Sequence, residues 1–444
     1  MRIAWCTPFT RRPVGEVSRA VTDELARRCD VEIVHPPTSE PLPTNLTTHP
    51  LLGLDCDADT RLLSSFDVVV YCIGDDARAY RSIYEASQRV PGIVVLHDLV
   101  VHDLFAEMWL TIGDIASYLN AVESLYGLPA RDIARREHES GSRWEWRPPY
   151  VAQMPMFELA VRGAWGVLTH SETGRRHVEQ RFTGPVDALA LPHVPSVVPA
   201  GVAPWRRGSA NDRDARVTRV VTVAEKGARV DTVLHALAEA RDVAATLDYV
   251  VFEWFDDWER ETLRTLVAEL GLEDVVALVR DPDEADVQAT FAQADLCIDV
   301  RTSPEAWTPA VVEAMWHAKP VVVSDLGSAA DIPDACVLKV DAANDAAGLA
   351  SALRRVLADR DALRAVGLRA AEYAREHLLV ERYAEGVVAF TDEVRRTRPY
   401  LAMNDDLARQ LGRVGIEPGM SVISRVAATV EDLFGGALDD GAVR

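Results

Sequence analysis

The sequence predicts an α/β protein with two doubly wound parallel sheets, one after the other along the chain. Three observations support this fold class. Short β-branched runs alternate with helical stretches, the alternation stops and restarts around a segment rich in Pro, Gly and Ala, and 48% of the 444 residues are hydrophobic. Because a chain of this length is too long for one ordinary core, we expect two domains of about 200 residues each.

The first half of the chain alternates strand-like and helix-like stretches. The strand-like runs are "RIAWC", "VEIVH", "DVVVYCI" and "GIVVLHD", and helical stretches such as "EVSRAVTDELARRC" and residues 77–89 lie between them. A last pair, "WGVLTH" and "SETGRRHVEQRF", has Ser171 at the predicted N-cap of its helix. This order is typical of a parallel sheet with helices on both faces, and it predicts a first domain over residues 1–200.

An insertion at residues 104–150 interrupts the alternation. It has a helical pattern and is rich in aromatic residues, namely Trp109, Tyr118, Tyr126, Trp144, Trp146 and Tyr150. Flat aromatic side chains can stack on a sugar or another flat ring, and they equally suit a hydrophobic core. Both interpretations stay open, and the first would give the insertion a role in choosing an acceptor.

The second half begins after a linker at 195–214, which lacks periodicity. Its strand-like runs are "VTRVVTVA", "LDYVVFEW", "VVALV", "LCIDV" and "PVVVSD", each followed by a helical stretch. We predict a second domain over 215–375, a crossing helix over 376–396 and a helical tail over 397–444. The tail carries an apolar stripe in 421–434, which would either form a homo-oligomer or cover the core.

Charge and cysteine usage exclude several classes of partner. The chain has 47 basic and 69 acidic residues and a net charge of −22, which opposes binding to nucleic acid or to an anionic membrane surface. The six cysteines form no C-x-x-C pair and read as buried thiols of a cytoplasmic protein. We also expect no signal peptide and no integral membrane segment.

Two acids lie close together in "SPEAWTPAVVEAM", residues 303–315. Glu305 follows a predicted strand, and Thr308 and Pro309 suit the N-cap and first position of the next helix. Glu313 would lie just beyond the first helical turn. Ligands of open parallel sheets bind at the carboxyl ends of strands, and the two oxygens of a carboxylate match the two hydroxyls of a vicinal diol. The pattern therefore indicates a site for a sugar or a nucleotide-sugar.

The sequence resembles the family-four retaining glycosyltransferases. The resemblance rests on "EAWTPAVVEAMWHAKPVVVSD" at 305–325, which matches the acid, seven residues and acid of this family, followed by Ala-Met and a valine strand. Also similar, in the same order, are "HDLVVHD", "LTHS", "LPHV" and "KGARVDTVLHAL". The resemblance covers most of 1–390 and implies the GT-B fold, in which two Rossmann-like sheets face each other. It also implies a donor such as a UDP- or GDP-sugar, an acceptor of unknown identity, and no metal or other cofactor.

Roles for residues of the second domain follow from the resemblance. Glu313 would hold the ribose diol of the donor. Glu305, with the loop that ends at Thr308, would hold hydroxyls of the transferred sugar. Lys226 and Arg229 would balance the charge that grows on the diphosphate as the glycosidic bond breaks.

The resemblance implies two contacts from the first domain as well. Gly15, in the loop after the first strand, would let the backbone approach the diphosphate. His97 would lie beneath the donor sugar and orient its hydroxyls. The expected catalytic residues are therefore His97, Lys226 and Glu305.

Departures from the family pattern leave other functions open. Thr308 stands where the family has Gly, Pro309 removes a backbone donor, Glu253 replaces a glycine, and Lys226 lies two residues earlier than usual. The first alternative is a catalytically silent GT-B protein that binds a nucleotide-sugar or a partner enzyme. The second is a nucleotide-sugar epimerase on the same fold.

Overall fold

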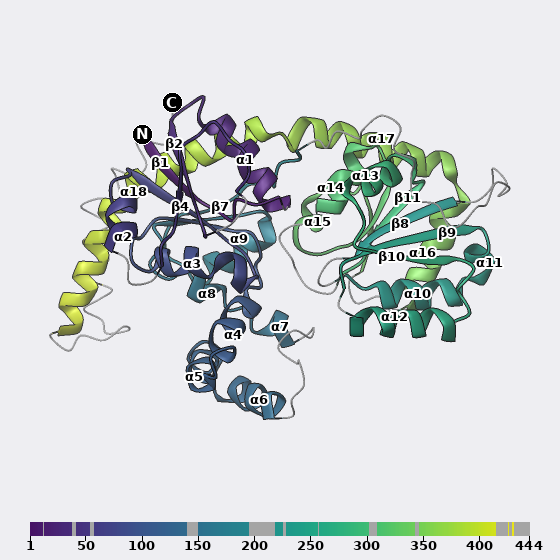
Figure 1. Ribbon diagram of the computed structural model, residues 1–444, viewed down its shortest axis with the longest axis horizontal. Coiled ribbons are helices and arrows are strands. Elements are labelled where there is room, and N and C mark those ends of the chain that lie inside the picture. The colour runs from purple at the N-terminus through teal and green to yellow at the C-terminus, as the bar shows by residue number, and fades with distance from the viewer. Residues whose placement is uncertain are drawn as a thin grey trace. The chain divides into compact units, whose positions relative to one another are not determined.

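The structure is a computed structural model, and its elements are labelled in Figure 1. The chain divides into two units, Met1–Thr391 and Asp392–Arg444. The residues that the structure describes are 1–11, 13–37, 41–53, 57–139, 150–194, 218–224, 228–255, 257–301, 309–341, 346–413, 425 and 429.

The first sheet has seven parallel strands in the order β3-β2-β1-β4-β5-β6-β7. Its strands are β1 (Arg2–Cys6), β2 (Asp30–His35), β3 (Thr48–Pro50), β4 (Val68–Ile73), β5 (Ile93–Leu96), β6 (Gly166–Thr169) and β7 (Val186–Ala188). Helices α1 (Pro13–Leu25), α2 (Asp57–Leu63), α3 (Ala77–Ser87), α8 (Phe157–Ala160) and α9 (Glu172–Glu179) connect them. Every residue of β4 and β5 is buried, as expected for central strands covered on both faces.

The predicted insertion forms helices α4 (His102–Leu110), α5 (Ile115–Tyr126) and α6 (Leu128–Glu139), followed by the short α7 (Tyr150–Gln153). Buried His102 of α4 contacts α5 and the segment after α7. Its Nδ1 donates to the carbonyl of Met154 at 2.7 Å, and its Nε2 lies 3.1 Å from the hydroxyl of Tyr118, which is fully buried. Tyr118 therefore belongs to the core, one of the two roles expected for the aromatic residues.

The second sheet has six parallel strands in the order β10-β9-β8-β11-β12-β13. Its strands are β8 (Thr218–Ala224), β9 (Leu247–Glu253), β10 (Val276–Arg280), β11 (Leu296–Asp299), β12 (Val321–Ser324) and β13 (Leu338–Val340). The helices are α10 (Val230–Glu239), α11 (Arg241–Ala244), α12 (Asp257–Glu269), α13 (Glu284–Gln293), α14 (Pro309–Trp316), α15 (Gly327–Asp331), α16 (Ala346–Ala358) and α17 (Arg360–His377).

Alternate residues of this sheet belong to different cores. Val220 and Val251 pack with the side of α10 and α16, whereas Val221 and Val250 pack with the side of α13, α14 and α17. Figure 1 shows these two groups of helices on opposite faces of the sheet. The near-continuous valine runs follow from this burial on both faces.

The last described helix, α18 (Val380–Arg413), extends from the first unit into the second. Its beginning contacts the first sheet's elements: Arg28 donates to Glu385 at 2.9 Å, and Gly386 lies against Leu189. Of the predicted stripe at 421–434, only 425 and 429 are among the described residues. Within the described ranges, none of the helices combines the length and apolar character that crossing a membrane requires.

Two doubly wound parallel sheets followed by a helical C-terminal region confirm the fold class predicted from the sequence.

Candidate active site

At the carboxyl edge of the second sheet, the end of the connection between β8 and α10 lies beside the start of the connection after β11. Ala228 and Arg301 form an antiparallel bridge, and the backbone N–H of Arg229 donates to the carbonyl of Val300 at 2.8 Å. Lys226, Glu305 and Thr308 belong to these loops but lie outside the described residues. The segments that flank them are therefore brought together, and the roles of these three side chains stay predictions.

Arg301 is a buried cation at this edge that the sequence reasoning missed. Its Nε donates to Asp299 Oδ1 at 2.8 Å, and both side chains are almost fully buried. The hydroxyl of Ser324 accepts from the backbone N–H of Arg301 and donates to its carbonyl, each at 2.8 Å. The ends of β11 and β12 are thus joined directly before the Glu305 loop. The sequence Asp-Val-Arg, with two charged residues at the end of an apolar strand, is the signal that could have indicated this buried ion pair.

Glu313 lies on α14, which begins at Pro309 as predicted. The residue is 9% exposed, so its carboxylate is largely removed from water. Two histidines flank it: His317 Nε2 lies 3.0 Å from Oε1, and His193 Nδ1 lies 3.7 Å from Oε2. An ionised carboxylate in this setting needs nearby donors, because burial without them is costly.

Arg229 already has an acidic partner. Its Nε and Nη2 donate to the two carboxylate oxygens of Asp231, each at 2.9 Å. Burial acts to raise the pKa of the Asp231 carboxyl, but the hydrogen bonds and positive charge of Arg229 lower it overall. The charge of Arg229 is therefore partly neutralised at the N-terminus of α10.

The predicted position of Gly15 in a loop is wrong, because Gly15 lies in the first turn of α1. A Cβ atom built on Gly15 would lie 2.0 Å from the carbonyl oxygen of Thr10. The loop after β1 therefore folds back so closely on the helix that only glycine fits. This packing explains the glycine without a ligand.

His97 directly follows β5 and is buried, with its Nδ1 2.9 Å from Nε2 of His170. His170 follows β6, and its Nδ1 lies 3.0 Å from the carbonyl of Leu189, which follows β7. Because a carbonyl only accepts, His170 carries its proton on Nδ1 and accepts from His97 with Nε2. Burial lowers the pKa of both rings, that of His170 to about 4. His97 is thus neutral, with its Nδ1 protonated.

Glu253, where the resemblance implies a glycine, is fully buried rather than directed at a ligand. Arg260 of α12 donates to both of its carboxylate oxygens, at 2.6 and 3.1 Å, and the backbone N–H of Phe255 donates to Oε2 at 2.9 Å. The Glu253 carboxylate therefore stabilises the connection between β9 and α12 through these hydrogen bonds. This is a structural reason for the departure.

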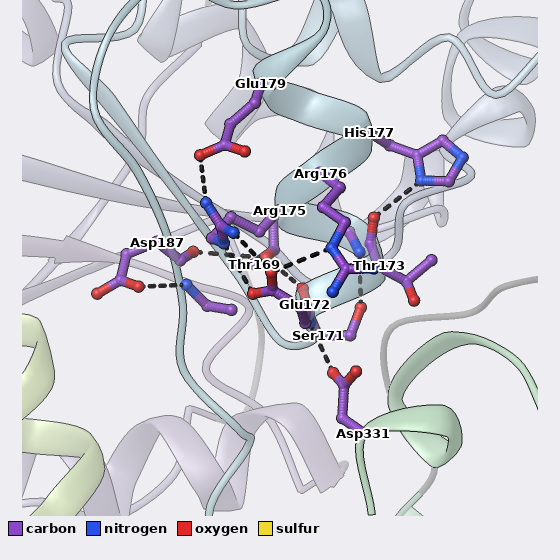
Figure 2. Close-up of polar contacts among 12 residues, drawn as sticks. Thr169, Ser171, Glu172, Thr173, Arg175, Arg176, His177, Glu179, Asp187 and Asp331 are labelled. Carbon is purple, nitrogen blue, oxygen red and sulfur yellow. Dashed lines mark hydrogen bonds and ion pairs between the residues drawn. The ribbon is translucent and has the colours of Figure 1, made fainter.

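A contact between the two sheets' elements lies at the N-terminus of α9, shown in Figure 2. Ser171 caps this helix by accepting from the N–H of Gly174 at 2.9 Å, as predicted. The backbone N–H of Glu172, the first residue of α9, donates to Asp331 Oδ2 of α15 at 2.6 Å. A carboxylate suits this position because the helix N-terminus carries partial positive charge.

In the described parts of the chain, no group of three or more His, Cys, Asp or Glu side chains could hold a metal ion.

The architecture of two doubly wound sheets with a C-terminal helical region is that of GT-B glycosyltransferases. Residues 203–377 match the family model described as "Glycosyl transferases group 1", so this part of the chain is similar to the group 1 glycosyl transferases. No curated protein sequence matches the chain.

Solved structures share this fold over nearly their whole length. Sucrose-phosphate synthase from Thermosynechococcus elongatus is 15% identical, with a TM-score of 0.61 over 89% of this chain and 100% of its own. Anabaena HepE in complex with UDP-glucose is also 15% identical, with a TM-score of 0.56 over 88% and 100%. A glycosyltransferase from Rickettsia africae is 12% identical, with a TM-score of 0.53 over 88% and 98%.

Proposed function

We propose that this protein is a retaining glycosyltransferase that moves a hexosyl unit from a nucleoside diphosphate sugar to an acceptor. The observation that carries this proposal is Glu313, a buried carboxylate on the first helix after β11, within the segment that matches the group 1 glycosyl transferases. The UDP-glucose in the HepE structure supports the same class of donor.

In this proposal Glu313 accepts hydrogen bonds from the ribose diol of the donor. Glu305 and the loop up to Thr308 hold hydroxyls of the transferred sugar. These assignments suit the connection of the flanking segments at Ala228 and Arg301. Lys226, with Arg229 beside it, would neutralise the departing diphosphate.

His97 contributes an oriented hydrogen-bond acceptor from the first sheet. Because its Nδ1–H is donated to His170, its other nitrogen, Nε2, carries a lone pair. A neutral hydroxyl of a hexose can donate to such an atom, whereas a carboxylate would be repelled. In this proposal His97 orients hydroxyls of the donor sugar, as the resemblance implies.

The proposed reaction occurs on one face of the sugar. As the bond between the anomeric carbon and the diphosphate oxygen breaks, the acceptor hydroxyl attacks from the same side. A phosphate oxygen of the departing nucleoside diphosphate takes the acceptor proton, so that the products are a glycoside and the nucleoside diphosphate. The protein must stabilise charge in this transition state rather than supply a nucleophile.

Mass spectrometry of reactions with UDP- and GDP-sugars tests the proposal. We expect nucleoside diphosphate to be released together with a product that is heavier than the acceptor by one hexosyl unit. Release of nucleotide and free sugar without any acceptor would instead support the epimerase alternative.

Pro309 favours a second candidate, a protein that binds a nucleotide-sugar without turnover. Proline begins α14, so the first helical position offers no N–H to a phosphate. Binding of UDP or GDP in a thermal-shift assay, with no turnover of any donor sugar, would favour this candidate.

A further inference from the structure

The carboxylate of Glu313 lies between two histidines that come from different parts of the chain. His317 lies one helical turn after Glu313, directly after the end of α14, whereas His193 lies in the segment after β7. Glu313 Oε1 is fully buried and forms no aligned hydrogen bond with the described residues, although His317 Nε2 is only 3.0 Å away. The carboxylate thus has electrostatic neighbours and retains lone pairs for further donors.

The second neighbour of His317 determines which of its nitrogens carries a proton. His317 Nε2 lies 3.3 Å from Oε1 of Gln288 on α13 and 3.0 Å from the Glu313 carboxylate. The amide oxygen of Gln288 only accepts hydrogen bonds, so Nε2 is the protonated nitrogen. The N–H of His317 therefore donates to Gln288, and the Glu313 carboxylate lies beside it as an electrostatic neighbour.

His193 is held rigidly against the same helix. Its backbone N–H donates to the carbonyl of Leu378 at 2.9 Å, and its ring lies 4.7 Å from that of Trp316. Desolvation lowers the pKa of His193, with Glu313 acting to raise it and His317 to lower it further. A neutral His193 best places its Nδ1–H toward the carboxylate, 3.7 Å away.

We propose that His317 and His193 are positioning residues that hold the Glu313 carboxylate in the rotamer that accepts the ribose diol of the donor. Each histidine lies beside one oxygen and restrains the orientation of the carboxylate toward the two hydroxyls. This inference rests on the proposed function, because it assigns the ribose to Glu313. It adds that discrimination between ribose and deoxyribose depends on residues that do not touch the ligand.

The ratio of affinities for UDP and 2′-deoxy-UDP tests the inference, with GDP and 2′-deoxy-GDP as a second pair. Calorimetry of the wild type is expected to show tighter binding of the ribonucleotide. His317→Leu keeps a similar volume without an N–H, and we expect this ratio to fall by roughly tenfold, because one polar contact that orients the charged carboxylate is lost. His317→Gln retains a donor and should restore most of the ratio, while affinity for 2′-deoxy-UDP stays unchanged in both variants.

A second variant keeps the test decisive if His317→Leu does not fold. His193→Phe preserves the ring against Trp316 but removes both nitrogens, and it should also lower the ratio. His177→Ala on α9, an exposed site, is the matched control and should leave the ratio unchanged.

Two outcomes would overturn the inference on different grounds. Equal weakening of both ligands, or an unchanged ratio in folded variants, would mean that the histidines only stabilise the helix. A wild type that binds neither nucleotide pair, or that does not discriminate, would overturn the proposed function and the inference with it.

Discussion

Asp331 accepts a hydrogen bond from the backbone N–H of Glu172 at 2.6 Å, across elements that follow different sheets (Figure 2). The acceptor belongs to α15 in the second half, and the donor is the first residue of α9 in the first half. Burial and the nearby charge of Glu172 raise the pKa of Asp331, while the hydrogen bond from Glu172 and the charges of Arg176 and Lys339 act against the rise. Asp331 thus caps the N-terminus of α9, a helix from which it is distant in the sequence.

Removal of this cap is expected to loosen the contact between the two halves. Asp331→Ala leaves the N–H of Glu172 without its acceptor, and solution scattering should report a larger radius of gyration in the absence of ligand. Asp334→Ala is the control, because Asp334 is 89% exposed and pairs with Lys339 in the same region. Identical scattering of wild type and Asp331→Ala would show that the hydrogen bond does not hold the halves together.

Glu313→Gln should weaken the binding of nucleoside diphosphate by about 1–3 kcal/mol, because a neutral amide replaces a charged acceptor. Calorimetry with UDP or GDP measures this change. Glu372→Gln, at an exposed position of α17, is the control. Unchanged affinity in a folded Glu313→Gln variant would exclude the proposed contact with the ribose.

The His97–His170 pair should make the fold less stable in mild acid. The pKa of His170 is lowered by burial from 6.5 to about 4, so the unfolded chain binds a proton at a higher pH than the folded one. The free energy of unfolding keeps its full value above pH 6.5 and decreases as the pH falls toward the folded pKa of His170. The total loss from this group amounts to roughly 3 kcal/mol. Urea unfolding from pH 7 to pH 4 measures this slope. The slope of unfolding free energy against pH should be shallower in His170→Gln and unchanged in His177→Ala. Equal slopes in all three proteins would refute the lowered pKa assigned to His170.

The buried pair of Glu253 and Arg260 should be more sensitive to loss of one partner than to loss of both. Arg260→Met leaves the fully buried Glu253 carboxylate without its bidentate donor, and we expect a marked decrease in the free energy of unfolding. The double variant Glu253→Leu with Arg260→Met replaces both charges by apolar groups and should recover much of the loss. A double variant less stable than Arg260→Met would contradict this view.

Much of the fold could be predicted because burial on both faces leaves a clear local signal. Runs such as that of β4 contain apolar residues at every position, and the helix starts at Pro309 and after Ser171 follow from capping chemistry. These features depend on neighbours in the sequence, so a pattern within about ten residues predicts them.

The arrangement of the candidate site depends on contacts between distant residues, which no local pattern contains. His97 and His170 are 73 positions apart, and their hydrogen bond arises because β5 and β6 are neighbours in the sheet. The position of Gly15 in helix α1 depends on the close carbonyl of Thr10, a contact that no local pattern indicates. Glu253 was recognised as unusual, but its partner Arg260 lies on the following helix and became evident only in the structure.

The anomeric configuration of the product tests the central claim most directly. Proton NMR can follow the anomeric proton of a UDP- or GDP-sugar during turnover in the presence of excess EDTA. We expect the signal of the donor to be replaced by that of a glycoside with the same configuration, at an undiminished rate, because cationic side chains of the protein balance the diphosphate. A product of inverted configuration, or turnover that begins only when magnesium or manganese is restored, would contradict the account.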